Sequence, residues 1–249
     1  MPYRAGVVLQ LPPTGNHADR VEKYLRRSLA NLGVEYVDLY LVHVPFGFEE
    51  RGDEVHPAAE DGSILMDSTT DHVALWKSKY CAELQAMEDQ VSAGRAKAIG
   101  LSNFNRLQIE RVLAAAKVPP ANLQVELHLY LQQAELLEFC RSKDIAVCAY
   151  SPLGSRGAAK LLSKELPDLM SNPVVLEVAA AHGKTPAQVL LRFAVQKDIA
   201  VIPKSTNPAR IKENFQIFDF ELTDEEVSKL NKLDQGPSGR IVDFSFLKG

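Results

Sequence analysis

The chain has 249 residues, of which 46% are hydrophobic and 24% charged, so it is long enough for one barrel-sized domain or two small ones. Its net charge of −4 gives no reason to expect a nucleic acid or an anionic membrane as partner. The three cysteines, Cys81, Cys140 and Cys148, form no CxxC pair, which suits a reduced cytoplasmic protein. The N-terminus is a poor signal peptide, and no apolar stretch approaches the roughly 20 residues of a membrane span.

Six short apolar runs predict β-strands. They are rich in Val, Ile, Leu and Tyr, as buried parallel strands tend to be. In chain order the runs cover residues 5–11, 36–44, 96–103, 123–129, 145–151 and 199–205.

Helical signals lie between these runs. Residues 21–32 carry apolar side chains at helical spacing, and Gly33 follows where a C-terminal cap belongs. Thr185 and Thr223 each begin a capping-box pattern, and Asn207-Pro208 predicts the start of a further helix. The alternation of strands and helices predicts a parallel sheet with helical crossovers. Residues 45–70 are expected to form a long polar loop without an element of its own, of the kind that is usually functional or mobile.

The strand ends favour a barrel over a doubly wound sheet. No glycine-rich GxGxxG turn follows the first strand, as a dinucleotide-binding doubly wound sheet would require. In a parallel barrel the strand ends converge on the face that carries the active site. The simpler alternative is that polar residues only mark where strands stop. Each run ends in hydrogen-bonding side chains: Gln10, His43, Ser102 and Asn103, Gln124 with Glu126 and His128, Tyr150 and Ser151, and Lys204 and Ser205.

Seven motifs in order resemble the aldo-keto reductase family and cover nearly the whole chain. They are LPPTGN (11–16), DLYLVHVP (38–45), GRAKAIGLSNFN (94–105), LQVELHLYLQQ (123–133), AYSPLGS (149–155), GKTPAQVLLRF (183–193) and IPKSTNPARIKEN (202–214). The form of LPPTGN and the terminal GRIVDF (239–244) resemble the animal aldose and aldehyde reductases of the family. The resemblance implies an α/β fold of the (β/α)8 TIM-barrel type, present as a single domain over residues 1–249, with NADPH across the C-terminal face of the barrel.

The resemblance also implies roles for individual residues. His43 matches the histidine that orients the substrate, and Tyr150 matches the aromatic residue on which the nicotinamide ring stacks. The residues that hold the amide of that ring correspond to Ser102, Asn103 and Gln124. The loop that binds the pyrophosphate corresponds to Ser151, Leu153 and Ser155. The residues that bind the 2′-phosphate correspond to Lys204, Ser205, Thr206 and Arg210, and those that contact the adenine correspond to Glu213 and Asn214.

Physical reasoning supports these roles, and each has a simpler alternative. A 2′-phosphate needs cations. Lys204 supplies a point charge and Arg210 a planar guanidinium group, and both lie beside the positive end of a predicted helix. This arrangement favours NADPH over NADH. Both residues are also compatible with ordinary surface charges. Tyr150 is also compatible with an aromatic residue of the core, and His43 with a core histidine whose ring is hydrogen-bonded inside the protein. Asp38 is interpreted as structural, and the remaining histidines have no metal-ligand spacing.

The chain departs from the family pattern in two places. The family has two β/α units before LPPTGN, which carry an aspartate and the tyrosine acid, and a lysine where Gln10 stands here. We therefore expect about six strands, an incomplete N-terminus and open barrel edges through which copies can associate. Residues 78–85 are an insertion relative to the family, and eight residues rotate a helix by about 80° out of phase. Together these departures suggest a truncated isoform.

The expected function is NADPH-dependent reduction of an aldehyde or ketone to an alcohol in the cytoplasm, with His43 as the remaining member of the family's catalytic set. The alternatives are a catalytically inactive NADP(H)-binding or structural remnant, such as a splice isoform, and a fragment without a biochemical role. The expected partner is a small-molecule carbonyl compound, and neither a nucleic acid nor a membrane is expected. Four aromatic residues either line a substrate pocket or pack a loop against the barrel: Phe46, Phe48, Trp76 and Phe244.

Overall fold

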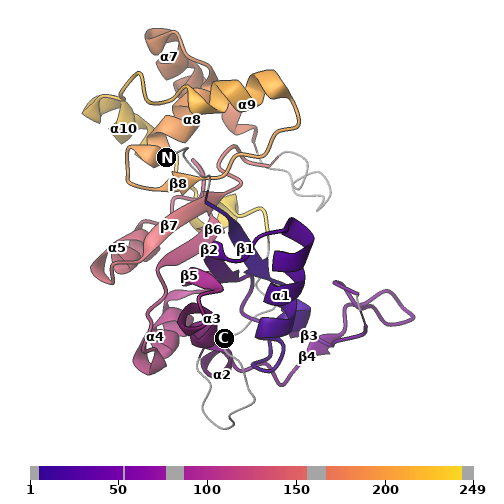
Figure 1. Cartoon of the computed structure of the whole chain (residues 1–249). Coiled ribbons are helices and arrows are strands. Elements are labelled where there is room, and N and C mark those ends of the chain that lie inside the picture. The colour runs from indigo at the N-terminus through magenta and orange to yellow at the C-terminus, as the bar shows by residue number, and fades with distance from the viewer. Residues whose placement is uncertain (1–5, 53, 77–86, 156–166, 243–249) are drawn as a thin grey trace. The chain divides into compact units, whose positions relative to one another are not determined.

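The computed structural model describes residues 6–52, 54–76, 87–155 and 167–242. The chain divides into two compact units, unit 1 over Met1–Leu123 and unit 2 over Gln124–Lys248. Strands alternate with helices in both, so the fold is α/β, as predicted (Figure 1). Residues 78–85 and Phe244 lie outside the described residues.

The sheet of unit 1 contains three parallel strands in the order β1-β2-β5. Each lies within a predicted apolar run: β1 is Val8–Leu11, β2 is Val37–Val42 and β5 is Ala96–Ser102. Gly100 permits a close approach in this sheet, because a Cβ atom there would lie 2.6 Å from both the Asn122 carbonyl oxygen and the Leu41 side chain.

In unit 1 the predicted C-terminal cap of one helix is confirmed. Helix α1 (Val21–Leu32) packs against β1 and ends at Gly33, whose left-handed φ of 64° suits glycine. Helix α4 (Arg106–Ala115) begins with a capping box between Asn105 and Gln108. The shorter helices are η1 (Pro13–Gly15), α2 (His72–Trp76) and α3 (Met87–Ser92).

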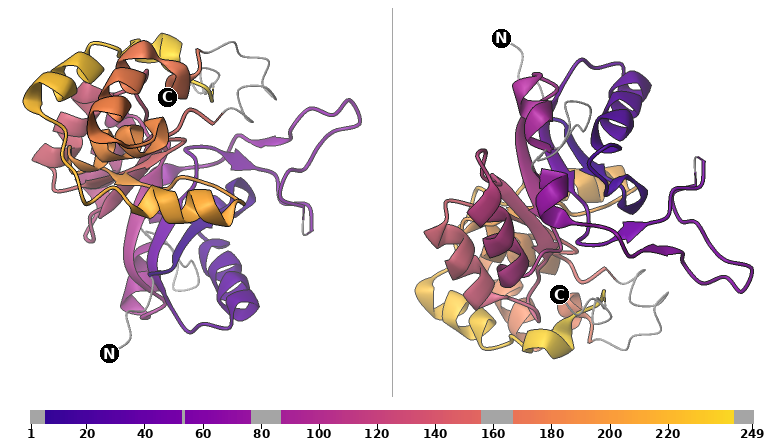
Figure 2. Two further views of the ribbon diagram at one scale, coloured as in Figure 1. Left: turned by 90° about the horizontal axis from the view of Figure 1, so that it is seen from above. Right: turned by 90° about the horizontal axis from the view of Figure 1, so that it is seen from below.

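The prediction that residues 45–70 carry no element is wrong. Strands β3 (Gly47–Phe48) and β4 (Met66–Asp67) pair in antiparallel fashion, and Ala58 bridges to Ile64 between them. Both views of Figure 2 show this hairpin as a ribbon that projects away from α1. Its strands have only two residues each, too few to produce the alternation by which a strand is recognised in a sequence.

Asp38 has the structural role that was expected. One carboxylate oxygen accepts a hydrogen bond from the Val7 amide at 2.8 Å, and the other forms an ion pair with Lys97 at 2.7 Å. Asp38 therefore links β2 to the chain that leads into β1 and to β5.

Unit 2 contains the other three predicted strands in the order β6-β7-β8, apart from the first two residues of β6, which belong to unit 1. Strand β6 is Asn122–Glu126, β7 is Ala146–Tyr150 and β8 is Ala200–Val201. Its helices are α5 (Ala134–Ser142), η2 (Leu169–Ser171), α7 (Pro173–His182), α8 (Pro186–Val195), α9 (Pro208–Phe215), α10 (Asp224–Asn231) and η3 (Gly236–Gly239). The capping boxes of Thr185 and Thr223 and the cap at Asn207 are confirmed.

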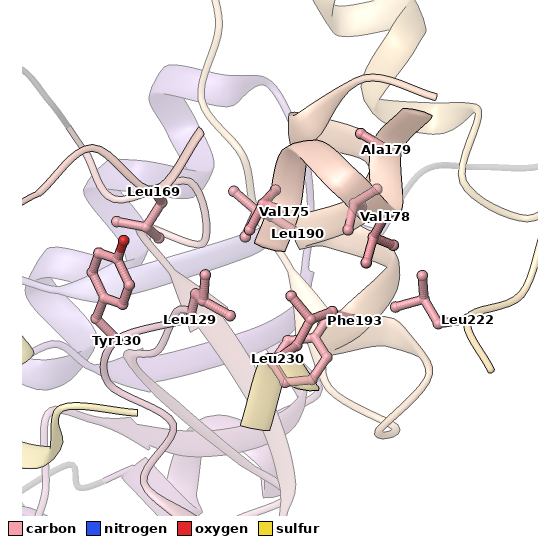
Figure 3. Close-up of a cluster of buried hydrophobic side chains, with 11 residues drawn as sticks. Leu129, Tyr130, Leu169, Val175, Val178, Ala179, Leu190, Phe193, Leu222 and Leu230 are labelled. Carbon is pink, nitrogen blue, oxygen red and sulfur yellow. The ribbon is translucent and has the colours of Figure 1, made fainter. Parts of the chain in front are cut away.

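The apolar core of unit 2 forms where α7, α8 and α10 meet the segment after β6 (Figure 3). Leu230 and Val175 are fully buried there, and Phe193 and Tyr130 nearly so. Burial of side chains of this size stabilises the fold by about 1.5–3 kcal/mol each. The core therefore fixes the backbone around Tyr130, which leads out of strand β6.

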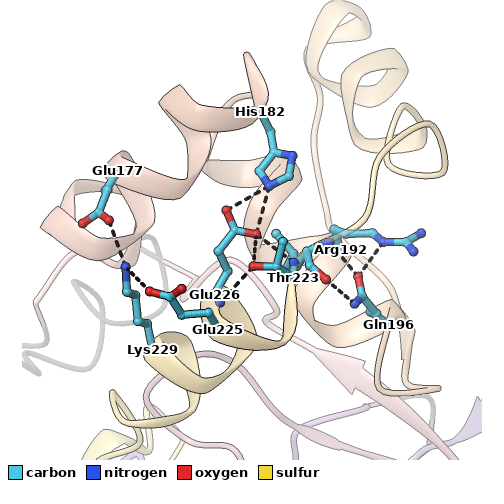
Figure 4. A network of polar contacts seen from close by, with 9 residues as sticks. Glu177, His182, Arg192, Gln196, Thr223, Glu225, Glu226 and Lys229 are labelled. Carbon is cyan, nitrogen blue, oxygen red and sulfur yellow. Dashed lines mark hydrogen bonds and ion pairs between the residues drawn. The ribbon is translucent and has the colours of Figure 1, made fainter.

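Polar contacts join α7 to α10 on the surface of unit 2 (Figure 4). His182 contacts both carboxylate oxygens of Glu226 at 3.0 Å, and Lys229 pairs with Glu177 at 3.2 Å. Burial would raise the pKa of Glu226, but hydrogen bonds from His182 and Thr223 outweigh it and lower that pKa. Within the described ranges, no helix is both long and apolar enough to span a membrane.

Candidate cofactor and active site

The candidate residues of unit 1 lie at the ends of two paired strands. In the β2–β5 register Val42 lies opposite Leu101, so His43 and Ser102 each come at the end of a strand. The Asn103 amide nitrogen donates to the His43 carbonyl at 2.9 Å and contacts the Ser102 hydroxyl at 3.1 Å. The structure thus brings together His43, Ser102 and Asn103.

Asn103 adopts a conformation that few residues tolerate. Its φ is 64°, in the left-handed region where asparagine is favoured among residues with a side chain. The two hydrogen bonds of its amide hold this backbone in place, and Ser102 beside it is fully buried. The amide is thereby fixed at the end of β5.

The environment of His43 favours the neutral imidazole. Partial burial disfavours the charged ring and lowers its pKa, and the nearby charge of His56 lowers it further. His43 is therefore neutral at pH 7 and can donate one hydrogen bond from its ring. The influence of His56 could not be foreseen, because that residue lies on the unpredicted hairpin.

Asn16 was not singled out in the sequence, although it ends the LPPTGN motif. Its buried amide nitrogen donates to the carbonyls of Val44 at 2.8 Å and Phe46 at 2.5 Å. These contacts hold the chain that follows His43. The motif itself was the available signal, but its partners lie 28 and 30 residues away.

The aromatic residues near the hairpin mostly pack inside unit 1. Trp76 is 1% exposed, and its ring nitrogen donates to the Val118 carbonyl at 3.0 Å. Phe48 is also buried, with its ring centroid 5.5 Å from that of Phe46. For Trp76 and Phe48 these contacts favour loop packing over a role in a pocket.

In unit 2, Gln124 lies in strand β6 and is 8% exposed, while Tyr150 ends β7 and is half-buried. The Leu127 amide donates to the Tyr150 carbonyl at 3.3 Å. Burial raises the pKa of Tyr150, and the charge of Glu126 raises it further. The phenol therefore stays protonated and neutral near pH 7, so its ring can serve as a stacking surface but not as a ready acid.

The loop after β7 has an unusual backbone. Ser151, Gly154 and Ser155 have φ values of 53°, 80° and 36°. Concave loops that direct backbone N–H groups at an anion use residues in this left-handed region. Leu153 lies in the same loop, so the three predicted pyrophosphate residues Ser151, Leu153 and Ser155 are adjacent.

The predicted 2′-phosphate residues lie on the loop between β8 and α9 and, for Arg210, in the first turn of α9. Asn207 caps α9 by accepting from the amides of Ala209 at 2.9 Å and Arg210 at 3.2 Å. Lys204 and Arg210 are both exposed, and neither forms an ion pair with any residue in the described part of the chain. Two such cations at a helix N-terminus suit a phosphate. Ser205 and Thr206 lie between them.

Of the predicted adenine contacts, Glu213 also has a structural partner. Its carboxylate accepts a hydrogen bond from the Thr185 hydroxyl at 2.6 Å, and its carbonyl accepts from Gln188 at 3.4 Å. These contacts join α9 to the start of α8. Asn214 follows it at the end of α9 and is half-buried.

The described residues contain no group of three or more His, Cys, Asp or Glu side chains that could hold a metal ion. The candidate residues of unit 1 are a histidine, a serine hydroxyl and a side-chain amide. Those of unit 2 include a half-buried phenol ring, left-handed loop residues and exposed cations, which are groups that can hold a flat ring and phosphates. The residues of unit 2 therefore fit an organic cofactor that carries an aromatic ring and phosphates.

Comparison with known proteins identifies the family of this chain. The aldo/keto reductase family profile matches residues 8–235. The chain belongs to the aldo-keto reductase family.

Individual relatives agree with this assignment. Aldo-keto reductase family 1 member A1 of Bos taurus is 46% identical over 229 residues, which cover 92% of this chain and 67% of that protein. The mouse protein of the same name is 47% identical over the same shares of both chains. The structure of the aldose reductase from Schistosoma japonicum matches with a TM-score of 0.81 and 38% identity, covering 93% of this chain and 69% of the other. This likeness confirms the predicted fold type.

Proposed function

We propose that the chain binds NADP(H) and reduces an aldehyde or ketone to an alcohol with the bound cofactor. The observation that carries the proposal is the pair of exposed cations, Lys204 and Arg210, beside the capped N-terminus of α9 and without an ion-pair partner in the described ranges. A 2′-phosphate would give these charges a partner, and NADPH has this group where NADH does not.

The remaining candidate residues have matching roles. Ser102, Asn103 and Gln124 would bind the nicotinamide amide, and the half-buried ring of Tyr150 would stack on the nicotinamide. Holding that ring in one orientation is what hydride transfer needs from the protein. Ser151, Leu153 and Ser155 would bind the pyrophosphate, Lys204, Ser205, Thr206 and Arg210 the 2′-phosphate, and Glu213 and Asn214 the adenine.

The bound cofactor would supply a hydride to the carbonyl carbon. The oxygen then needs a proton, and His43 is the candidate in unit 1 whose side chain titrates close enough to neutral pH to act as an acid. Because its pKa is lowered by burial and by His56, neutral His43 is a weak acid at pH 7. We therefore expect slow turnover that rises as the pH falls.

A second candidate function is NADP(H) binding without turnover. It is favoured by Gln10, an uncharged residue in β1 at the position where the family resemblance implies a lysine, and by the neutral state of His43. Neither residue supplies the charge that would make a neighbouring acid stronger.

Isotope transfer separates the two candidates. The protein is mixed with a small aldehyde and NADPH that carries deuterium at the transferable position, and the alcohol is analysed by mass spectrometry. Reduction predicts deuterium in the alcohol, at a rate about 10²–10⁴-fold lower in His43→Ala. Bound cofactor without label transfer supports the second candidate. Absence of NADPH binding contradicts both.

A further inference from the structure

Glu126, at the end of β6, has a fully buried carboxylate that binds the far end of the chain. One oxygen accepts from the Ile241 amide at 2.6 Å, and the other accepts from the Val242 amide at 2.8 Å. His128 contacts the first oxygen at 3.1 Å. A single carboxylate is therefore the acceptor for two consecutive backbone amides that lie 115 and 116 residues away.

Further contacts hold the segment that leads to these amides. The Gln235 amide donates to the Tyr130 carbonyl at 2.9 Å. Gly239 lies so close to that carbonyl that a Cβ atom would be 2.1 Å from its oxygen. Tyr130 belongs to the apolar core of unit 2, so these contacts attach the segment to the packed core of the unit (Figure 3).

Gln133 connects the segment back to Glu126. Its amide nitrogen donates to the Glu126 carbonyl at 2.5 Å, and its amide oxygen accepts from Arg240 at 3.5 Å. We call residues Gly236–Val242 the C-terminal segment. This segment contacts the Glu126 side chain directly and the Glu126 backbone carbonyl through Gln133.

The same glutamate lies beside two candidate cofactor residues. Gln124 is two positions earlier in β6, so both side chains emerge on one face of the strand. The Leu127 amide, which directly follows Glu126, donates to the Tyr150 carbonyl at 3.3 Å. Glu126 therefore lies beside the residue proposed to stack on the nicotinamide, and its charge raises the pKa of the Tyr150 phenol while that of Arg240 lowers it.

Glu126 carries the charge that this role needs. Burial would raise its pKa, but the hydrogen bonds from His128, Ile241 and Val242 outweigh burial and lower it. An ionised carboxylate makes stronger hydrogen bonds to backbone amides than a neutral group does. Because a buried ionised group is costly without its partners, the C-terminal segment has one strongly preferred position.

We propose that Glu126 is a positioning residue that fixes the C-terminal segment beside Tyr150, so that anchoring of this segment and NADP(H) binding at Gln124 and Tyr150 strengthen each other. The coupling rests on the proposed function. Linkage requires it to be reciprocal: bound cofactor must protect the segment, and loss of the anchor must weaken cofactor binding by the same factor.

Trypsin cleavage after Arg240 reports on the anchor, because the Ile241 amide of the scissile bond is the one that donates to Glu126. The rate is followed by mass spectrometry as release of the peptide that begins at Ile241, with and without NADPH. We expect Glu126→Gln to cleave at least about tenfold faster than the wild type, since an amide cannot accept from both backbone N–H groups as an anion does. NADPH should slow cleavage of the wild type. The Glu126→Gln variant should bind NADPH several-fold more weakly than the wild type does.

The matched control is Glu138→Gln, which removes one exposed carboxylate from the same unit and should change neither readout. If Glu126→Gln does not fold, Val242→Pro removes one donor to the carboxylate while leaving Glu126 and the Arg240–Ile241 bond intact, and the same increase is expected.

Equal cleavage rates in folded Glu126→Gln or Val242→Pro and the wild type would overturn the anchor. Faster cleavage with unchanged NADPH affinity, or cleavage in the wild type that NADPH does not slow, would overturn the coupling. If the wild type binds no NADPH, the proposed function and the coupling fail together, while the cleavage rates without cofactor still decide whether Glu126 anchors the segment.

Discussion

The candidate residues of unit 1 and those around the N-terminus of α9 in unit 2 differ in their contacts with the rest of the protein. Asn103 and Ser102 are tied to their neighbours and are half-buried or buried. Lys204 and Arg210 are exposed, and neither has an ion-pair partner in the described ranges. The first pair makes contacts that stabilise the fold even without a ligand. The second pair has no such contacts in the described ranges, which agrees with the proposal that it binds the phosphate of a ligand. Substitution of Asn103 should therefore destabilise unit 1, whereas substitution of Lys204 and Arg210 should leave the stability of unit 2 unchanged.

The largest effect is expected from Gly100→Ala in unit 1. The added methyl group would lie 2.6 Å from the Asn122 carbonyl oxygen and the Leu41 side chain, so the sheet that carries Ser102 must shift. We expect a loss of about 3 kcal/mol in the free energy of unfolding, measured by urea denaturation. Gly6→Ala is the control, because its methyl group would meet only ordinary contacts at 3.7 Å. Equal stability of the two variants would show that β5 is not packed as described.

Asn103→Ala should cost somewhat less, about 2–3 kcal/mol. It removes both hydrogen bonds of the amide and places alanine at a φ of 64°. Asn103→Gly removes the same hydrogen bonds without the backbone strain, so it should recover about 1 kcal/mol of the loss. If the glycine variant were no more stable than the alanine variant, the left-handed backbone at this position would be contradicted.

The pH dependence of unit 1 should show a smaller effect. The pKa of His43 is lowered in the folded state, so between that value and the unfolded value near 6.5 the unfolded chain binds more protons. The stabilising contribution is present above about pH 6.5 and is lost as the pH falls through the folded pKa. The pKa of His72 is lowered as well, chiefly by burial, and adds to the effect. Imidazole titration by NMR should place the pKa of His43 below its ordinary value, and a value above it would contradict the described environment.

The parts of this structure that could be predicted from the sequence are those that local patterns determine. Six apolar runs gave six strands, and the caps at Gly33, Thr185 and Thr223 lie where their residue types indicated. These features depend on a few adjacent residues. The β3–β4 hairpin could not be predicted, because two-residue strands have no periodicity and depend on pairing across 17 residues of intervening chain.

The candidate site was predictable as a set of residues but not as a set of contacts. Gln124 and Tyr150 were identified by their position at strand ends and by the family resemblance. The anchoring of Ile241 by Glu126 joins residues 115 apart, so no local pattern could indicate it. The same holds for the contact between Glu213 and Thr185, which gives a predicted cofactor residue a structural partner.

The smallest effect on stability, and the most direct test of the account, is expected from the double variant Lys204→Ala/Arg210→Ala. Calorimetric titration with NADPH and with NADH should show that the wild type prefers NADPH. The double variant should bind NADPH at least about 10²-fold more weakly, bind NADH as before, and unfold within about 0.5 kcal/mol of the wild type. Lys212→Ala, which removes an exposed cation from the last turn of α9, should leave all three quantities unchanged. Equal affinity of the wild type and the double variant for NADPH, or a wild type that does not distinguish NADPH from NADH, would contradict the account.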